Sequence, residues 1–268
     1  MSENEILISI ITINFNNADG LYKTLESVRT QSFQNYEQII IDGGSTDNSV
    51  AVINEFLSDT EYSKHVSYWC SEKDKGIYNA MNKGIEHANG KYVYMLNSGD
   101  ILVNESFYLV APFLIKNDNC VLHGAVDHYK DGVYWGTISH TVDELKTMML
   151  PHQALFVATK LHKKYGVYNE EFRIAADREF LVRLKKVNAN FIHIPVIVCI
   201  FNLDGISSNS NKLKKQEYSI IDSTFYTKKQ LFMNKIIHII RITIELLLPG
   251  IISFPLVKLL HSLRTKKD

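Results

Sequence analysis

Apolar runs alternate with segments of helical periodicity over the first hundred residues, and this alternation restricts the fold more than any other feature. Residues 6–13 form a nearly unbroken run rich in isoleucine, which is typical of a strand covered on both faces of an α/β sheet. A helix is expected to follow, with Asp19 as its N-cap, and a second strand is expected over residues 36–41.

The same pattern repeats twice more. Helices are expected around residues 50–57 and 77–88, and strands at residues 66–70 and 92–96. The alternation predicts an α/β fold with a Rossmann-like, mainly parallel central sheet flanked by helices. In such sheets ligands bind at the carboxyl ends of the strands.

After Asn97 the alternation ends. Asp131-Gly132 predicts a hairpin turn, residues 151–157 a strand and residues 177–187 a short helix. We therefore expect one domain over residues 1–211. Its first half, residues 1–100, has the regular alternation and its second half, residues 101–211, does not. A helical C-terminal extension is expected over residues 212–268.

Composition excludes several classes of function. Lys and Arg total 29, as do Asp and Glu, so there is no overall positive field for nucleic acid. The 3 cysteines are widely spaced, which argues against both a disulfide framework and a zinc site. The polar N-terminal residues do not resemble a secretory signal, so the cytoplasm is the expected compartment.

The C-terminal extension is both apolar and basic. Arg241, Glu245 and Lys258 interrupt every apolar window of the length that a spanning helix needs, which is roughly 20 residues. A helix lying on the membrane surface, with its cations toward anionic headgroups, fits better. The alternative is a helical cap that packs on the domain or on a second subunit of a homo-oligomer.

A polar cluster, Asp42-Gly43-Gly44-Ser45, stands where the second expected strand ends. The glycines allow the backbone to approach a ligand closely, and the following helix would present free amides. Asp42 is suited to accept hydrogen bonds from a nucleobase edge. Ser45 and Thr46 are interpreted instead as N-caps of the next helix.

Four motifs, in their order and spacing, resemble those of family 2 glycosyltransferases of the GT-A fold. They are S-I-I-T-I-N-F-N, I-I-D-G-G-S-T-D-N-S, D-K-G-I-Y-N-A-M-N-K-G-I and Y-M-L-N-S-G-D. The resemblance covers residues 6–210 and is strongest to bacterial enzymes that build O-antigen, capsule or exopolysaccharide. Linked motifs are more specific than any single one.

The resemblance implies that the donor nucleotide and its sugar are bound by residues of the first half. These are Thr12, Asn14, Asp42, Lys75, Gly76, Asn82 and Ser98. Lys75 is a mobile cation suited to a diphosphate, although a lysine near a helix start is also common on protein surfaces. Asn82 is equally compatible with a helix surface.

The segment Asn97-Ser98-Gly99-Asp100 stands where the family's metal-binding D-x-D motif belongs, with Asp100 as its only charged group. One or two carboxylates, phosphate oxygens and waters can hold Mg²⁺, so the resemblance implies a Mg²⁺ or Mn²⁺ cofactor. His152 is a second candidate for the metal, a phosphate or the acceptor. The alternatives are a helix N-cap for Asp100 and simple packing for His152.

Asp177 resembles the family's catalytic base. A single carboxylate suffices because a nucleoside diphosphate leaves readily once a metal absorbs its charge. Asp177 would take the proton of the acceptor hydroxyl as that oxygen attacks the anomeric carbon. An N-cap role is the alternative, and the two roles can coexist.

The combined prediction is an inverting, metal-dependent hexosyltransferase acting from a UDP-sugar on a hydroxyl of a glycan. The acceptor is expected to be linked to polyprenyl diphosphate at the inner face of the cell membrane. The loop at 204–207 resembles a family loop that closes over the nucleotide. The rival hypotheses are a sugar nucleotidyltransferase and a non-catalytic nucleotide-sugar-binding protein.

Overall fold

The computed structural model describes residues 5–146, 149–202, 211–233, 236, 240 and 243. The chain divides into two compact units, Met1–Ile221 and Asp222–Asp268. The expected division at residue 211 falls ten residues earlier than this boundary. All of the elements that form the site belong to the first unit.

The first half of the sheet is parallel, in the order β3-β2-β1-β4. Its strands are β1 (Ile8–Asn14), β2 (Tyr36–Asp42), β3 (Val66–Ser71) and β4 (Tyr92–Met95). Every residue of β1 and β2 is buried, as the unbroken apolar runs predict. The predicted α/β fold class is therefore confirmed.

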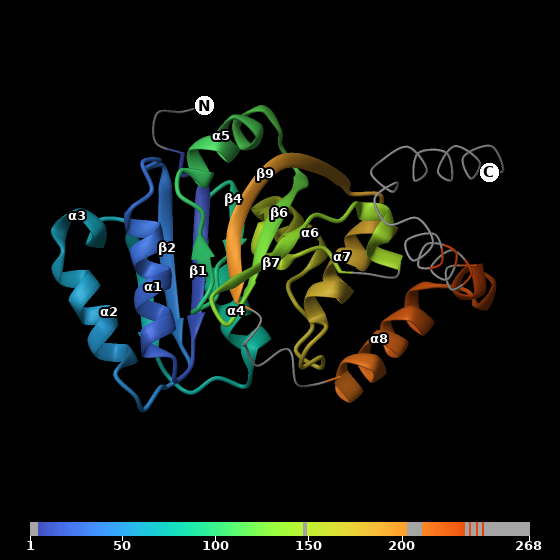
Figure 1. Ribbon diagram of the computed structural model, residues 1–268, viewed down its shortest axis with the longest axis horizontal. Helices are drawn as coiled ribbons and strands as arrows, with labels where there is room; N and C mark the ends of the chain where they lie inside the picture. Colours follow the sequence, from blue (N-terminus) through green and yellow to red (C-terminus); the bar gives the residue numbers. More distant parts are fainter. Residues whose placement is uncertain are drawn as a thin grey trace. The chain divides into compact units, whose positions relative to one another are not determined.

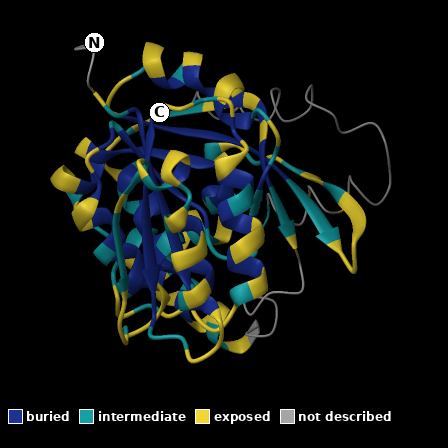
Figure 2. Ribbon diagram, turned by 90° about the vertical axis from the view of Figure 1, so that its left-hand side faces the viewer, coloured by how far each residue is buried: buried dark blue, intermediate teal, exposed yellow. Residues whose placement is uncertain are grey.

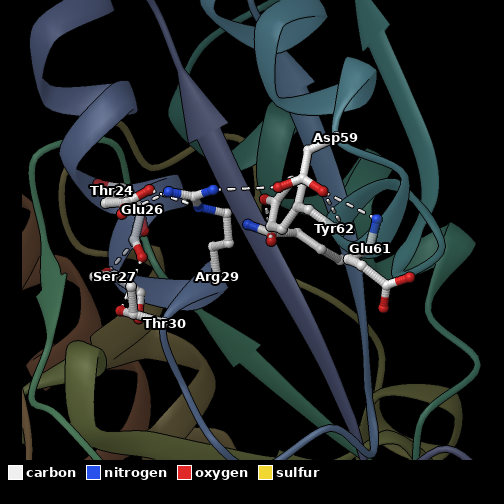
Figure 3. Close-up of polar contacts among 9 residues, drawn as sticks. Thr24, Glu26, Ser27, Arg29, Thr30, Asp59, Glu61 and Tyr62 are labelled. Carbon is white, nitrogen blue, oxygen red and sulfur yellow. Dashed lines mark hydrogen bonds and ion pairs between the residues drawn. The ribbon is translucent and has the colours of Figure 1, made fainter.

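The helices of this half are α1 (Ala18–Arg29), α2 (Ser49–Ser58), α3 (Thr60–Ser63) and α4 (Ile77–His87). The N-cap of α1 is Asn17, whose side chain accepts a hydrogen bond from the N–H of Gly20; the expectation of Asp19 was wrong. Helix α2 starts later than expected, after Asn48, so neither Ser45 nor Thr46 is its N-cap. Arg29, in the last turn of α1, pairs with Glu26 and Asp59 (Figure 3).

The chain connections lead to one side of β1 at first and later to its other side. Chain connections β1-α1-β2 and β2-α2-α3-β3 proceed to one side of β1, whereas α4 returns the chain to β4 on the other side (Figure 1). Because parallel crossovers are right-handed, α4 covers the opposite sheet face from α1 and α2. The carboxyl ends of β1 and β4 thus form a topological switch point, where open α/β sheets bind ligands.

The second half adds mixed pairing to the sheet, whose order continues β4-β8-β6-β9-β5. Its elements are β5 (Ile101–Leu102), α5 (Ser106–Lys116), β6 (Cys120–Lys130), β7 (Val133–Ile138), η1 (Val142–Lys146), η2 (His152–Ala154), β8 (Leu155–Ala158), α6 (Thr159–Tyr165), α7 (Ala176–Lys186), β9 (Asn190–Asn202) and α8 (Asn211–Phe225). The hairpin at Asp131-Gly132 is confirmed. The expected strand at 151–157 begins only at Leu155, because the 3₁₀ turn η2 takes up its first residues.

Strand β8 is antiparallel to both β4 and β6, so β4 and β6 run in the same direction. The core is continuous across both halves of this first unit (Figure 2, buried strands in dark blue). Helix α4 lies so close to β1 that a Cβ on Gly84 would stand 2.3 Å from Cγ2 of Ile11. This close approach packs the C-terminal half of α4 against the middle of β1.

In the described part of the chain, no helix is long and apolar enough to cross a membrane. Most of the apolar, basic tail and the loop at 204–207 lie outside the described residues. The predictions made for them therefore remain predictions.

Candidate active site

Asp42 is the centre of a hydrogen-bond network at the carboxyl ends of β1, β2 and β3. Its carboxylate accepts hydrogen bonds from Asn14 Nδ2 (2.7 Å), from Ser71 Oγ (2.6 Å), and from both the N–H and the Oγ of Ser45 (2.9 and 2.6 Å). Burial would raise the pKa of Asp42, but these donors outweigh it and hold the pKa below its ordinary value. Asp42 is therefore an ionised, fully engaged carboxylate.

Asn14 retains an unused acceptor in this network. Its Nδ2 donates to Asp42, whereas its Oδ1 is buried and has no hydrogen-bond partner among the described residues. A buried acceptor without a partner is costly. A ligand N–H group at the end of β1 would satisfy it.

Phe15 supplies an apolar surface beside this acceptor, and sequence reasoning overlooked it. Its ring is 59% exposed, and a Cβ on Gly43 would stand 3.3 Å from that ring and 2.5 Å from Asp74 Oδ2. Gly43 is thus required for the close approach of these three residues. The available signal was an aromatic residue that directly follows a buried strand within a run of asparagines.

The structure places two other expected nucleotide contacts inside the protein. Thr12 is buried, and its Oγ1 accepts a hydrogen bond from Gln38 Nε2 (3.1 Å). Asn82 is also buried, with its Nδ2 donating to the carbonyl of Tyr168 and to Glu170, and its Oδ1 accepting from the N–H of Tyr168. These contacts favour positioning roles, so direct nucleotide binding by Thr12 and Asn82 stays a prediction.

Lys75 and Gly76 lie in an exposed turn before α4. The turn is held by Asp74, whose Oδ1 accepts a hydrogen bond from the N–H of Gly76 (2.8 Å), and by Asn79, whose Oδ1 accepts one from the N–H of Lys75 (3.1 Å). Gly76 has a φ of 128°, a conformation that favours glycine. The Lys75 side chain extends from a fixed backbone.

The loop after β4 is held against α1 by hydrogen bonds to the N-cap residue of that helix and to Thr24 within it. Ser98 lies beside Asn17, whose Nδ2 donates to both its carbonyl and its Oγ. Gly99 has a φ of 100°, and its N–H donates to Thr24 Oγ1 (2.9 Å). Asp100 is only 4% exposed, and burial raises its pKa to about 8. Its carboxyl group therefore lies in the interior, in surroundings that favour the protonated form.

Asp177 is joined to the end of β4 by a chain of polar side chains. Tyr78 donates a hydrogen bond to Asp177 Oδ1 (3.2 Å), and His152 Nδ1 lies 3.9 Å from Asp177 Oδ2. His152 Nε2 lies 3.2 Å from Asn97 Nδ2. Four separate segments of the chain thus bring these residues together. The sequence did not predict that Tyr78 contacts Asp177 or that Asn97 contacts His152.

The protonation states of His152 and Tyr78 follow from their surroundings. Burial lowers the pKa of His152, although the carboxylate of Asp177 acts in the opposite direction. A neutral imidazole that accepts from Asn97 through Nε2 carries its proton on Nδ1, toward Asp177. Burial, followed by the charge of Asp177, raises the pKa of Tyr78, so Tyr78 stays a hydrogen-bond donor.

Asp177 is not a helix cap. The N-cap of α7 is Ala175, and among the backbone groups of the residues that the structure describes, only the adjacent N–H of Arg178 donates to the Asp177 carboxylate. About a fifth of its side chain is exposed, at 19%. A carboxylate that is open to solvent, oriented by Tyr78 and near a neutral imidazole can accept a proton from a bound hydroxyl.

Donor atoms for a divalent cation are few at this site. Among the described residues there is no group of three or more His, Cys, Asp or Glu side chains placed to hold a metal ion. Asn97 Oδ1 is buried without a hydrogen-bond partner in this part of the chain, next to the ring of His152. The buried amide oxygen of Asn97 fits a cation that takes its remaining ligands from phosphate and water. His152 can join it through Nε2 only where that nitrogen no longer accepts from Asn97 Nδ2.

Comparisons with known proteins indicate a glycosyltransferase, as the sequence motifs do. The model of the family described as glycosyl transferase family 2 matches residues 9–174. An uncharacterized glycosyltransferase of Mycobacterium tuberculosis is 34% identical over 212 residues, covering 75% of this chain and 77% of that protein. A PGL/p-HBAD biosynthesis glycosyltransferase of Mycobacterium bovis is 28% identical over 209 residues, covering 76% and 80%.

Two solved structures share the fold. S. aureus TarS 1-349 in complex with UDP-GlcNAc has a TM-score of 0.64 and 17% identity, covering 80% of this chain and 64% of that chain. The mannosyltransferase PcManGT from Pyrobaculum calidifontis, in complex with GDP-Man and Mn²⁺, has a TM-score of 0.61 and 15% identity, covering 81% and 63%. The chain spans slightly less than two thirds of either solved chain, and these likenesses show the GT-A fold alone.

Proposed function

The chain belongs to glycosyltransferase family 2, and from that premise we propose that it is an inverting hexosyltransferase. It moves one sugar from a nucleoside-diphosphate sugar to a hydroxyl group of a glycan. The observation that carries this proposal is the chain Tyr78-Asp177-His152-Asn97, which orients one partly exposed carboxylate at the switch point of the sheet. Family membership removes the rival hypothesis of a nucleotidyltransferase.

Asp177 is the catalytic base in this proposal. As the acceptor oxygen attacks the anomeric carbon, its proton passes to the Asp177 carboxylate, and the bond from the anomeric carbon to the diphosphate breaks. Attack from the face opposite the leaving group inverts the anomeric configuration. One carboxylate is enough because the diphosphate departs without protonation, unlike the sugar alkoxide of a glycoside hydrolase.

The nucleotide occupies the ends of β1 and β2. Its base stacks on the exposed ring of Phe15, and an N–H group of the base meets the unused Oδ1 of Asn14. Asp42 keeps Asn14 and Ser45 in place. Lys75 faces the diphosphate. UDP is the preferred nucleotide, with support from the UDP-GlcNAc complex of TarS, whereas the PcManGT structure is a complex with GDP-Man.

A divalent cation, Mg²⁺ or Mn²⁺, completes the site. Asn97 would hold it through its amide oxygen, and His152 would join through Nε2 once that nitrogen no longer accepts from Asn97 Nδ2. When bound, the cation would neutralise charge that develops on the departing diphosphate. Asp100, the metal ligand expected from the sequence, is buried, and its N–H donates to the carbonyl of Asn97 (3.0 Å), so metal binding by its carboxyl group stays a prediction. PcManGT contains Mn²⁺, which supports a cation in this chain.

The acceptor is a glycan of bacterial surface polysaccharide, carried on polyprenyl diphosphate at the inner face of the membrane. Support comes from the basic, apolar sequence of residues 234–268 and from relatives named for PGL/p-HBAD biosynthesis. A surface-bound helix would bring the site close to a lipid-linked substrate.

The test combines donor binding with product analysis. UDP, GDP and dTDP sugars are screened by thermal shift with and without Mn²⁺, since a ligand at about a hundredfold its Kd adds roughly 2.7 kcal/mol of stability. The donors that bind are then incubated with polyprenyl-diphosphate-linked and p-nitrophenyl glycosides, and the anomeric configuration of the product is read by NMR. Binding without turnover of any acceptor would favour the non-catalytic alternative, and a product of retained configuration would refute inversion.

A further inference from the structure

We propose that Glu217, on α8, is a positioning residue for Asp177. Its carboxylate holds the backbone that leads into α7, and it thereby sets where the base stands relative to the bound sugar. This inference rests on the role of Asp177 proposed above. It assigns to the first C-terminal helix a part in catalysis that does not involve the membrane.

Within the described part of the chain, the hydrogen bonds of the Glu217 side chain are all made to three consecutive backbone N–H groups. Its Oε1 accepts from the N–H of Arg173 (2.8 Å), and its Oε2 accepts from the N–H groups of Ile174 and Ala175 (2.9 Å each). Glu217 is only 5% exposed. Three hydrogen bonds to one buried carboxylate fix three successive peptide groups, and such charge-assisted bonds are roughly twice as strong as neutral ones.

The segment has no cap of its own. The N-cap of α7 is Ala175, which has no side chain able to bind the first turn of the helix. Ala175 and Ala176 are fully buried. The direction in which α7 starts therefore depends on Glu217, and Asp177 is the second residue of that helix.

A second contact joins the next residue of α8, Tyr218, to the residue that follows Asp177 on α7. The guanidinium of Arg178 lies 4.4 Å from the ring centroid of Tyr218, within the range of a cation–π interaction. Arg178 also donates to the carbonyl of Leu145 (3.3 Å). Helix α8 thus contacts the chain on both sides of Asp177, before it through Glu217 and after it through Tyr218.

Glu217→Gln removes the charge with little change in shape. The glutamine amide offers one oxygen, and its NH₂ group would face a backbone N–H that needs an acceptor. Because a 1 Å misplacement of a catalytic group can cost about a hundredfold in rate, we expect kcat to fall by roughly ten- to a hundredfold. The Kd for UDP should stay within about twofold, since the proposed nucleotide contacts lie on β1 and β2.

Glu37→Gln is the matched control. Glu37 is likewise buried, and its Oε1 accepts from the N–H groups of Asn89 (2.6 Å) and Gly90 (3.1 Å). Asn89 and Gly90 precede β4, so they lie at the amino-terminal ends of the parallel strands, whereas the site lies at the carboxyl ends. This variant should lose stability as Glu217→Gln does while keeping its kcat.

A double-mutant cycle with Asp177→Asn gives the decisive reading. If Glu217 acts through Asp177, adding Glu217→Gln to Asp177→Asn leaves the residual transfer rate unchanged within about twofold, because coupled groups are not additive. If Glu217→Gln lowers the residual rate by its full single-variant factor, or if Glu37→Gln lowers kcat equally, the inference is overturned. Full activity of Asp177→Asn alone would instead overturn the proposed base and leave the effect of Glu217 without its stated cause.

Two further measurements test the inference even if Glu217→Gln does not fold well. Glu217→Asp keeps the charge and should restore part of the lost kcat even if Glu217→Gln folds poorly. Hydrogen exchange does not depend on turnover, and the amides of residues 173–178 should exchange faster in Glu217→Gln and not in Glu37→Gln. Unchanged exchange in that segment would refute the link between α8 and α7.

Discussion

Replacing Asp100 with asparagine should stabilise the folded protein, and by more as the pH rises. Asp100 is buried at the base of the loop after β4, and burial raises its pKa from the ordinary value of 3.8 to about 8. In the unfolded chain the same carboxyl ionises near its ordinary value. Between these two values the unfolded state is ionised while the folded state holds a proton.

The sign and size of the effect on the free energy of unfolding follow from this difference in pKa. A folded pKa above the unfolded one favours the folded state below the lower value, and this advantage is lost as pH rises toward the folded pKa. Each pH unit between them corresponds to about 1.36 kcal/mol, so the cost of retaining Asp100 is about 1.5 kcal/mol at pH 5 and about 4 kcal/mol at pH 7. Asparagine has no such cost, because it does not ionise.

Urea unfolding of both proteins from pH 5 to pH 8 measures the effect. The free energy of unfolding of Asp100→Asn minus that of the wild type should grow by about 3 kcal/mol between pH 5 and pH 7. Asp118→Asn is the control: Lys160 lowers the pKa of Asp118, so this carboxylate is ionised in both the folded and the unfolded state from pH 5 to pH 8, and its stability difference should not change with pH. A difference that does not change with pH would refute the burial of a protonated Asp100.

Two other substitutions test the packing and the nucleotide site. Gly84→Ala places a Cβ 2.3 Å from Ile11 Cγ2, so we expect a loss of about 1–3 kcal/mol in urea unfolding, and an unchanged midpoint would contradict the close helix–strand contact. Phe15→Ala should weaken UDP binding by about 1–3 kcal/mol, as loss of base stacking does in nucleic-acid-binding proteins, with little change in melting temperature because the ring is exposed. Calorimetric titration checks this, and a wild-type Kd in Phe15→Ala would exclude stacking.

The first half of the fold could be predicted closely from the sequence, because the hydrophobic periodicity of each segment there matches the burial of its residues in the structure. The isoleucine-rich run became β1, and residues 36–41 became most of β2. Where boundaries failed, a side chain had a better partner than expected. Ser45 binds Asp42 and so does not cap α2, and Asn17 takes the cap of α1 that was expected at Asp19.

The second half and the site were harder to predict because they depend on contacts between distant residues. Nothing local distinguishes Asp100, which is buried, from an exposed loop aspartate. The link from Asp177 to Tyr78 spans 99 positions of the chain. The contacts of Glu217 with the start of α7 likewise arise only once α8 has packed. Motif order could place Asp177 near the site, whereas its orientation required the structure.

The role of Asp177 is tested most directly by Asp177→Asn, with Asp118→Asn as a matched surface control. Transfer and binding of the donor sugar are measured on the same preparations. We expect the Asp177 variant to lose at least about a hundredfold in transfer, as removal of a general base does, with the donor Kd unchanged and the control fully active. Wild-type transfer by Asp177→Asn, with donor bound normally, would contradict the account.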